Sequence, residues 1–516
     1  MAASSPSSQP TPRSPLVAVL DLGKSNKKVV LVDDRLAIVA SRSAAFPATC
    51  HPGAGGTGEG QESILVEQVD AIFAWFLAQL RELGREFPIA ALAVSTHGAT
   101  IACLGADGRP AVPVVAYETD LGEAGSRELD AEFYRQCGPL ERLQDETGTC
   151  DLPLLINPAK QILFLQQHFP RDWARTTTIL AYPCYWGWRF TGQLAAEPTY
   201  TFNHSFLHDI RTRRPSSVAL KLGCVPHLDV AMKRPWDRLG TLSAEVQAAT
   251  GLGALPVAVG IHDSNAALLP YLLTRGDRDF CLNSTGTWCV AMHRVKHVQY
   301  GKDELGQKII FNVDALGSLV KASFLMGGMD YQLHHGLIGG SDPGFAAERL
   351  AAALARPRDA ILPGAFASQF PRCSGGALVD GAVVPLADLK SGARPGFLAE
   401  ATLAHDLLNV SLALQSEVAI RRTGVKDGTA IFIEGGFRQN ATFLAVLAAL
   451  FPKNPIACTS LAEATACGTA LLGHALVAGC DPQALADRIV IDEIPVERVE
   501  LPGLAAYRTA WLKAAG

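Results

Sequence analysis

The chain has 516 residues, more than one hydrophobic core usually holds, so we expect two domains of roughly 250 residues each. A net charge of -5 with 18% charged residues excludes the large basic surface that a nucleic-acid-binding protein needs. No stretch reaches the length of a membrane span, and residues 1–15 lack the apolar core of a signal peptide. We expect a disordered tail over 1–15 and small-molecule partners, with no nucleic acid and no membrane.

The pattern of the twelve cysteines is typical of a protein in a reducing compartment. They include no Cys-x-x-Cys pair, and several lie in apolar runs, where free cysteine behaves as a small hydrophobe. Neither a zinc site nor a disulfide framework is indicated, and a reducing, cytoplasmic location fits best.

The ordered part begins with a strand hairpin, 16–20 and 29–32, whose turn contains Asp21, Gly23, Lys24 and Ser25. A P-loop is excluded because Ala18 stands where that motif requires glycine. The backbone N–H groups of the turn could still line an anion, and Asp21 could hold a hydrated Mg²⁺. Asp and Gly are also ordinary turn residues, so the turn alone leaves both interpretations open.

The next elements are a glycine-rich loop at 53–60, a helix over 64–83 and strands over 89–95 and 112–117. The loop matches Gly-x-Gly-x-x-Gly formally, but no strand runs directly into it, which favours a surface loop. His97 and Asp120 follow the two strands, at the sheet edge where α/β folds bind ligands.

A helical pattern at 160–169 leads into an aromatic stretch at 182–188. Carbohydrate sites combine aromatic faces with convergent hydrogen-bonding groups. The candidate sugar contacts are His97, Asp120, Tyr185, Trp186, Asn203 and His204. A place in the core or on the surface is the alternative for each, and His97 is the strongest candidate.

Asp263 lies between a buried strand at 255–259 and a helix at 265–272, close to the domain boundary that we expect at residue 256. Its carboxylate could cap the helix, or it could take a proton from a substrate hydroxyl that attacks a γ-phosphorus. The position of Asp263 between two glycine turns favours the general base.

The second glycine turn, with Thr285, Gly286 and Thr287, separates strands at 280–282 and 288–292. Farther on, a strand at 430–434 meets Gly435 and Gly436 before a helix over 440–451, followed by a strand at 455–457 and a helix over 462–476. The two glycines would let a nucleotide approach the backbone, although Asn440 could equally be a plain helix cap. Glu463 fits a capping box with Ser460, so we give it no ligand role.

The order of five segments resembles the FGGY carbohydrate kinases, within the actin-like ATPases, from residue 16 to about 476. The segments are 21–23, 95–98, 260–263, 284–287, and 435–440 with 463–468 behind it. The resemblance implies an α/β protein with two actin-like (ribonuclease H-like) domains of related topology, 16–256 and 257–516, flanking a deep cleft. It also implies ATP mainly on the second domain and a ketose or polyol mainly on the first, with a homodimer as one assembly to expect.

The resemblance also implies roles for individual residues. Asp263 looks like the catalytic base, Asp21 like the Mg²⁺ site, and His97 like a sugar contact, with Asp120 and Trp186 as further candidates. The residues on the ATP side would be Gly23, Lys24, Ser25, Thr285, Gly286, Thr287, Gly435, Gly436 and Asn440.

Two departures from the family bear on the phosphate contacts and on the substrate. Lys24 stands where many members have Thr or Ser, and Tyr117-Glu118-Thr119-Asp120 replaces a Trp-x-Asp-x-Arg segment. The chain looks closer to the fuculose and rhamnulose kinases than to the xylulose and glycerol kinases. We expect an ATP- and Mg²⁺-dependent kinase acting on a hydroxyl of a small sugar, most simply a ketose. The alternatives are a sugar-independent nucleotide-switch ATPase and a low-activity sugar sensor.

Overall fold

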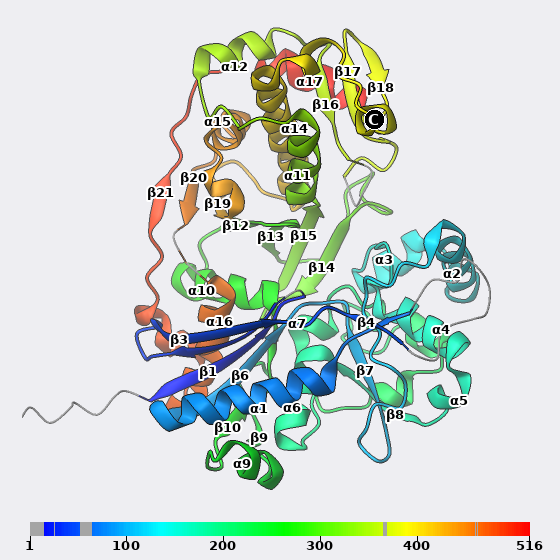
Figure 1. Ribbon diagram of the computed structural model, residues 1–516, viewed down its shortest axis with the longest axis vertical. Helices are drawn as coiled ribbons and strands as arrows, with labels where there is room; N and C mark the ends of the chain where they lie inside the picture. Colours follow the sequence, from blue (N-terminus) through cyan, green and yellow to red (C-terminus); the bar gives the residue numbers. More distant parts are fainter. Residues whose placement is uncertain (1–14, 25, 52–63, 365–368, 460, 462) are drawn as a thin grey trace, which may run out of the picture.

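The computed structural model describes residues 15–24, 26–51, 64–364, 369–459, 461 and 463–516. Figure 1 shows two α/β halves, each built around a mixed sheet of seven strands. The expected α/β class with two domains of related topology is confirmed. The glycine-rich loop at 53–60 and Ser25 lie outside the described residues.

The first sheet has the strand order β3-β2-β1-β6-β10-β9, with β11 beside β6. Its strands are β1 (Leu16–Leu22), β2 (Asn26–Val32), β3 (Ile38–Ala45), β6 (Ile89–Thr96), β9 (Arg238–Thr241), β10 (Pro256–Ala258) and β11 (Ile261–His262). The strand β1 is antiparallel to β2 and parallel to β6, which places Asp21 opposite Ser95. The carboxyl ends of β1 and β6 therefore meet at one edge. Because β10 and β11 also pair with β6, the first sheet continues past residue 256 to His262.

Side chains of β1 alternate between two hydrophobic cores, as a strand covered on both faces requires. Ala18 and Leu20 pack with α1 (Val69–Glu86), whose buried residues Ile72, Phe76 and Leu80 recur every fourth position. The helix begins at Val69 rather than at residue 64, because residues 65–66 form the short strand β5 (Leu65–Val66) with β4 (Thr49–Cys50).

The expected strand at 112–117 is wrong. Among the described residues, this segment makes only an isolated bridge between Val66 and Val115. Pro113 lies inside it and has no N–H to donate to a neighbouring strand, which explains why an apolar run fails to join a sheet.

The second sheet has the order β14-β15-β13-β12-β19-β20-β21. Its strands are β12 (Phe280–Thr285), β13 (Cys289–Val295), β14 (Ile309–Val313), β15 (Leu319–Leu325), β19 (Ala430–Gly435), β20 (Ile456–Thr459) and β21 (Glu493–Pro495). The strand β12 is antiparallel to β13 and parallel to β19, repeating the relation of β1 to β2 and β6. The two glycine turns thus occupy equivalent places in the two sheets.

Two helices lie between the sheets in Figure 1, α10 (Asp263–Arg275) and α16 (Ala464–Ala478). Ala266 and Leu269 of α10 join the core on the first sheet, whereas Leu268 and Tyr271 join the core on the second. A Cβ on Gly468 would lie 1.8 Å from the Ala266 carbonyl oxygen, so the two helices pack in backbone contact. The helix that begins at Asp263 is therefore fixed against both halves.

A second connection joins the halves at Gln144 of α3 (Leu140–Thr147). Its Nε2 donates to the carbonyl oxygens of Gln307 and Ile309 at 3.0 and 2.9 Å, and its Oε1 accepts from the Gly306 N–H at 2.7 Å.

The remaining elements of the first half are β7 (Ile101–Gly105), β8 (Thr176–Ala181), α2 (Gly122–Cys137), α4 (Pro158–His168), α5 (Pro170–Trp173), α6 (Tyr182–Thr191), α7 (Pro198–Thr201), α8 (Ser217–Lys221), η1 (Val225–Leu228) and α9 (Ala244–Thr250). Those of the second half are α11 (Gly327–Ile338), α12 (Ala347–Leu354), β16 (Ala360–Leu362), β17 (Gly376–Val379), β18 (Ala382–Val384), α13 (Leu386–Lys390), η2 (Gly396–Ala399), α14 (Ala401–Arg422), η3 (Gly436–Gln439), α15 (Ala441–Leu450), η4 (Pro482–Arg488) and α17 (Leu504–Ala515). Within the described ranges, no helix has the length and apolar character needed to cross a membrane.

Candidate active site

A cavity of about 310 Å³ opens between the two halves. The first half contributes His97, Gly98, Tyr117, Asn203, His204, His262 and Asp263 to its walls, and the second contributes Ser284, Trp288, Val290, Asn312 and Phe324. Aromatic faces with polar side chains between them suit a small molecule that carries several hydroxyl groups. We call this the sugar cavity.

Asp263 begins α10 and lines the sugar cavity. Its Oδ1 accepts hydrogen bonds from the N–H and Oγ of Ser264 at 2.6 and 3.2 Å. Burial raises the pKa of Asp263 to about 6, although the Ser264 bonds oppose the rise. The His262 Nδ1 lies 3.1 Å away, but burial lowers the pKa of His262 to about 4, so that ring is neutral near pH 7. Asp263 is thus a carboxylate without a cationic partner among the described residues, as a general base should be.

Asp21 lies at the end of β1, where it accepts a hydrogen bond from the Ser95 Oγ at 3.0 Å. Its pKa is raised to about 6, first by burial and then by the negative charge of Asp263. A buried carboxylate that lies near a second carboxylate favours a cation close to it.

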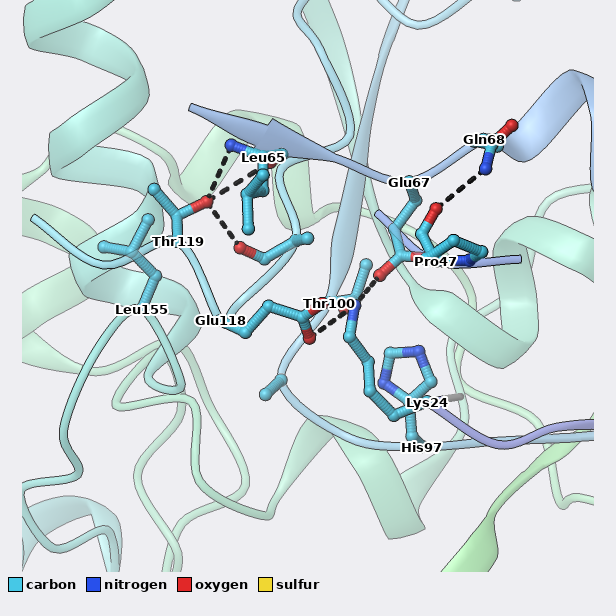
Figure 2. A network of polar contacts seen from close by, with 12 residues as sticks. Lys24, Pro47, Leu65, Glu67, Gln68, His97, Thr100, Glu118, Thr119 and Leu155 are labelled. Carbon is cyan, nitrogen blue, oxygen red and sulfur yellow. Dashed lines mark hydrogen bonds and ion pairs between the residues drawn. The ribbon is translucent and has the colours of Figure 1, made fainter. Parts of the chain in front are cut away.

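Lys24 follows the first glycine turn, but its side chain extends toward the sugar cavity. Figure 2 shows it between Glu67 and Glu118, with His97 beside it. The ammonium lies 2.8 Å from Glu118 Oε2 and is also paired with Glu67, whose side chain is fully buried. The ammonium is 5.2 Å from the centre of the Tyr117 ring, which lines the cavity. The positive charge expected at the phosphate turn is therefore held by two carboxylates on the sugar side.

A second lysine supports the turn itself. The Lys27 ammonium is buried and donates to the carbonyl oxygens of Gly23 and Lys24 at 2.8 and 2.9 Å. Burial lowers its pKa to about 8. Lys27 and Glu67 were not singled out from the sequence, and Glu118 was noted only within the segment at 117–120. The alternation of β2 could have indicated that Lys27 points inward, whereas no local pattern marks Glu67.

Three histidines meet on the sugar side of the cavity. The His97 Nδ1 donates to the Gly98 carbonyl oxygen at 2.7 Å, and burial holds the pKa of His97 well below its usual value. The neutral ring therefore keeps Nε2 as a buried acceptor, with no partner within the described part of the chain. A Cβ on Gly98 would lie 2.5 Å from His204 Nε2 and 2.6 Å from His262 Nε2, so both rings pack against this glycine.

Three of the other sugar-contact candidates lie elsewhere. Trp186 is fully buried in the core of the first half, where its ring packs edge-on against Phe76. Asp120 is exposed and accepts the Gly122 N–H at 2.9 Å before α2. Tyr185 is also fully buried beside Trp186. The aromatic or acidic character of these candidates did not indicate whether their side chains face the cavity.

The second glycine turn and the Gly435–Gly436 segment are brought together. Thr285 lies opposite Gly435 in the parallel register of β12 and β19. Gly435 has φ 85°, and a Cβ there would lie 2.0 Å from the Thr285 carbonyl oxygen, so a side chain would collide with the neighbouring strand. Gly286, Thr287, Gly435 and Gly436 are exposed. They form a ledge of accessible backbone, which we call the glycine ledge.

Asn440 is the N-cap of α15, where its Oδ1 accepts from the Phe443 N–H at 2.9 Å. Its Nδ2 donates to Asn409 Oδ1 at 2.8 Å. The cap is thus confirmed as a structural role of Asn440. Glu463, expected in a capping box, instead accepts from the Lys28 ammonium at 2.9 Å, while Ser460 lies outside the described residues.

The residues present fit Mg²⁺ and ATP. No group of three or more His, Cys, Asp or Glu residues in the described ranges is placed to hold a metal, so Asp21 would leave most positions to water and phosphate, as Mg²⁺ prefers. The glycine ledge offers backbone without side chains where a nucleotide could lie close.

Comparison with known proteins identifies the family. Residues 16–270 match the family described as FGGY family of carbohydrate kinases, N-terminal domain, and residues 277–482 match Carbohydrate kinase FGGY, C-terminal domain. A rhamnulokinase from Bacteroides thetaiotaomicron is 28% identical over 203 residues, which is 39% of this chain and 40% of that protein. The match therefore spans about two fifths of this curated relative.

Solved structures agree over nearly the whole length. A carbohydrate kinase from Novosphingobium aromaticivorans has 26% identity and a TM-score of 0.77, with 98% of this chain and 99% of that chain covered. A xylulose kinase from Lactobacillus acidophilus, at 14% identity, has a TM-score of 0.76 with 96% of each chain covered, and thus shares the fold. The chain belongs to the FGGY family of carbohydrate kinases.

Proposed function

We propose that this protein transfers the γ-phosphate of ATP to a hydroxyl of a small sugar, most simply a ketose. The observation that carries the proposal is Asp263, a carboxylate without a cationic partner among the described residues, on a cavity that both halves line. The family and the fold of the sugar kinases support the same activity.

In this reaction Asp263 takes the proton of the attacking sugar hydroxyl. The hydroxyl oxygen forms a bond to the γ-phosphorus, the bond from that phosphorus to the β–γ bridging oxygen breaks, and ADP leaves. Because little covalent chemistry falls to the protein, placement and charge compensation account for most of the rate. The position of α10 against both sheets supports a fixed place for Asp263.

Asp21 would hold the Mg²⁺ that accompanies ATP, and the ion would supply charge neutralisation on the phosphates. The glycine ledge would carry the nucleotide, with the turn at Gly23 and the turn at Thr285 to Thr287 facing the phosphates. Lys24 is not proposed as a phosphate contact, because its ammonium is paired with Glu67 and Glu118.

A neutral sugar suits the cavity better than a sugar acid. His97 and His262 are neutral near pH 7, and Asp263 would repel a carboxylate substrate. The rhamnulokinase relative supports a ketose of the deoxy-sugar type, with Asn203 and His204 as further contacts. We also propose a cytoplasmic location and a division of the domains near α10.

A coupled ADP-release assay with ATP, Mg²⁺ and a panel of ketoses, aldoses and polyols tests this function. Release stimulated by one or a few sugars supports the kinase. ATP hydrolysis that no sugar changes would instead indicate the nucleotide-switch ATPase, and sugar binding without turnover would indicate a sensor.

A further inference from the structure

A second cavity, of about 410 Å³, lies within the first half, away from the glycine turns. Its floor consists of buried apolar side chains, including Ile101, Leu180, Ala195 and Leu207. Its mouth is formed by more accessible residues, among them Met232, which is 46% exposed. The volume falls within the range of sites that hold small organic ligands.

Two nitrogen-bearing side chains in this cavity lack partners. The His208 Nδ1 is buried and makes no hydrogen bond with any described residue. The Arg213 guanidinium is half-buried and makes no hydrogen bond or ion pair in the described ranges, although the negative charge of the buried Asp314 acts on it. Buried polar atoms normally find partners, so the unpartnered His208 Nδ1 beside a guanidinium without hydrogen bonds marks a place for a ligand.

Both side chains lie against the same aromatic ring. The Arg213 guanidinium carbon is 4.8 Å from the centre of the Phe202 ring, and the His208 ring centre is 5.5 Å from it. Arg213 has φ 62°, a left-handed conformation that is rare for arginine and is held by a bond from its N–H to the Asp209 carbonyl oxygen at 2.9 Å. The guanidinium is therefore positioned by the turn and by the ring.

Arg213 brings a positive charge to this wall of the cavity, which the buried Asp314 offsets only in part because it also pairs with Arg294. Burial lowers the pKa of Arg213 below its ordinary value, yet a guanidinium remains protonated. Burial also lowers the pKa of His208 to about 4, which makes that ring a neutral hydrogen-bonding group near pH 7. Asp229 also lines the cavity, but it is exposed at the mouth.

We propose that this cavity is a second ligand site, which binds a small organic carboxylate whose apolar body lies on the floor and whose carboxylate meets Arg213 and His208. Arginine presents a planar fork that matches two carboxylate oxygens, and such charge-assisted bonds are the strong ones. The apolar floor favours a ligand with an apolar body over a fully hydrated anion, because the burial of apolar surface lowers the free energy of binding.

The second site lies back to back with the sugar cavity. Tyr200 lines the second cavity, and its ring centre is 5.6 Å from that of His204 and 5.8 Å from that of His262, which line the first. The Tyr200 side chain is thus the shared wall. The ligand at the second site is separate from the sugar, so its binding does not depend on the proposed kinase reaction.

Calorimetry on the full-length protein, without sugar or nucleotide, tests the site with phenylacetate as the probe and phenylacetamide as its neutral counterpart. We expect phenylacetate to bind, and Arg213→Gln to weaken it roughly tenfold or more. Arg214→Gln is the matched control, because Arg214 is the exposed neighbour and does not line the cavity. It should change the affinity by less than about twofold. Equal thermal midpoints would show that both variants are folded.

A structure of the complex would then locate the probe, with its ring on Leu180 and its carboxylate at Arg213. Three results would overturn the proposal: no binding of phenylacetate, equal binding of the amide, or an affinity that Arg213→Gln leaves unchanged. Phenylacetate found in the sugar cavity alone would overturn it as well.

Discussion

The Lys24 ammonium lies 2.8 Å from Glu118 Oε2 and pairs on its other side with Glu67. One residue thus joins the first glycine turn to two acidic segments on the sugar side of the cleft. Glu67 is fully buried, and its Oε2 has no hydrogen-bond partner within the described ranges, so Lys24 supplies its charge compensation. The departure at position 24 shapes the sugar side of the site rather than the phosphate turn.

Lys24→Met should destabilise the protein by about 2–4 kcal/mol, because it removes the ion-pair partner of the buried Glu67 carboxylate and leaves only the more distant charge of Lys27. Urea unfolding measures the loss. The double variant Lys24→Met/Glu67→Gln should recover most of it, and Glu118→Gln should cost less than about 1 kcal/mol because Glu118 is partly exposed. A double variant as unstable as the single one would contradict the ion-pair account.

Activity should fall at acidic pH. A general base works only when ionised, and burial raises the pKa of Asp263 to about 6. We therefore expect kcat/KM to rise with pH through about 6 and then level off. Asp21, with a pKa also about 6, would steepen the rise. A profile that stays flat down to the ordinary carboxyl value of 3.8 would contradict the raised pKa.

Gly98→Ala should weaken sugar binding selectively. The new Cβ would lie 2.5 and 2.6 Å from the Nε2 atoms of His204 and His262, so both rings must move. We expect the KM for the sugar to rise by roughly tenfold while the KM for ATP stays within about twofold. Gly253→Ala is the control, because no atom lies within 4 Å of its Cβ position. Equal changes in both KM values would argue against a local effect on the sugar cavity.

Gly435→Ala should damage the nucleotide side. The Cβ would collide with the Thr285 carbonyl oxygen at 2.0 Å, and φ 85° disfavours a side chain. We expect a lower thermal midpoint and ADP binding at least about tenfold weaker. In Gly436→Ala the nearest atom is 3.9 Å away, so the midpoint should not change. A stable Gly435→Ala protein with normal ADP affinity would show that the ledge tolerates a side chain.

The two hairpins, the parallel strand β19 and the helix after Asp263 could be predicted from the sequence, because alternating apolar runs broken by glycine turns are local signals. The pairing of Thr285 with Gly435 could not be derived locally, since 149 residues separate the bonded Thr285 Oγ1 and Glu434 carbonyl oxygen. Only the resemblance to the family, which rests on the order of five segments, placed Thr285 and Gly435 together on the ATP side.

The sugar side was predicted less well. Trp186 was expected at the sugar, but it is fully buried in the core. The sequence of an aromatic stretch does not distinguish side chains that line a cavity from side chains that pack in a core. The Lys24 contacts depend on chain segments 43 residues or more away, and sequence spacing says nothing of them. Residues near a strand end were therefore easier to place than residues brought in by loops.

The central claim is that Asp263 is the general base of a sugar kinase. Single-turnover and steady-state ADP release by Asp263→Asn, with the best sugar of the panel, tests it most directly. The variant should keep its fold and its ADP affinity, because the amide is isosteric, while kcat falls by roughly a thousandfold. Turnover like that of the wild type would contradict the account.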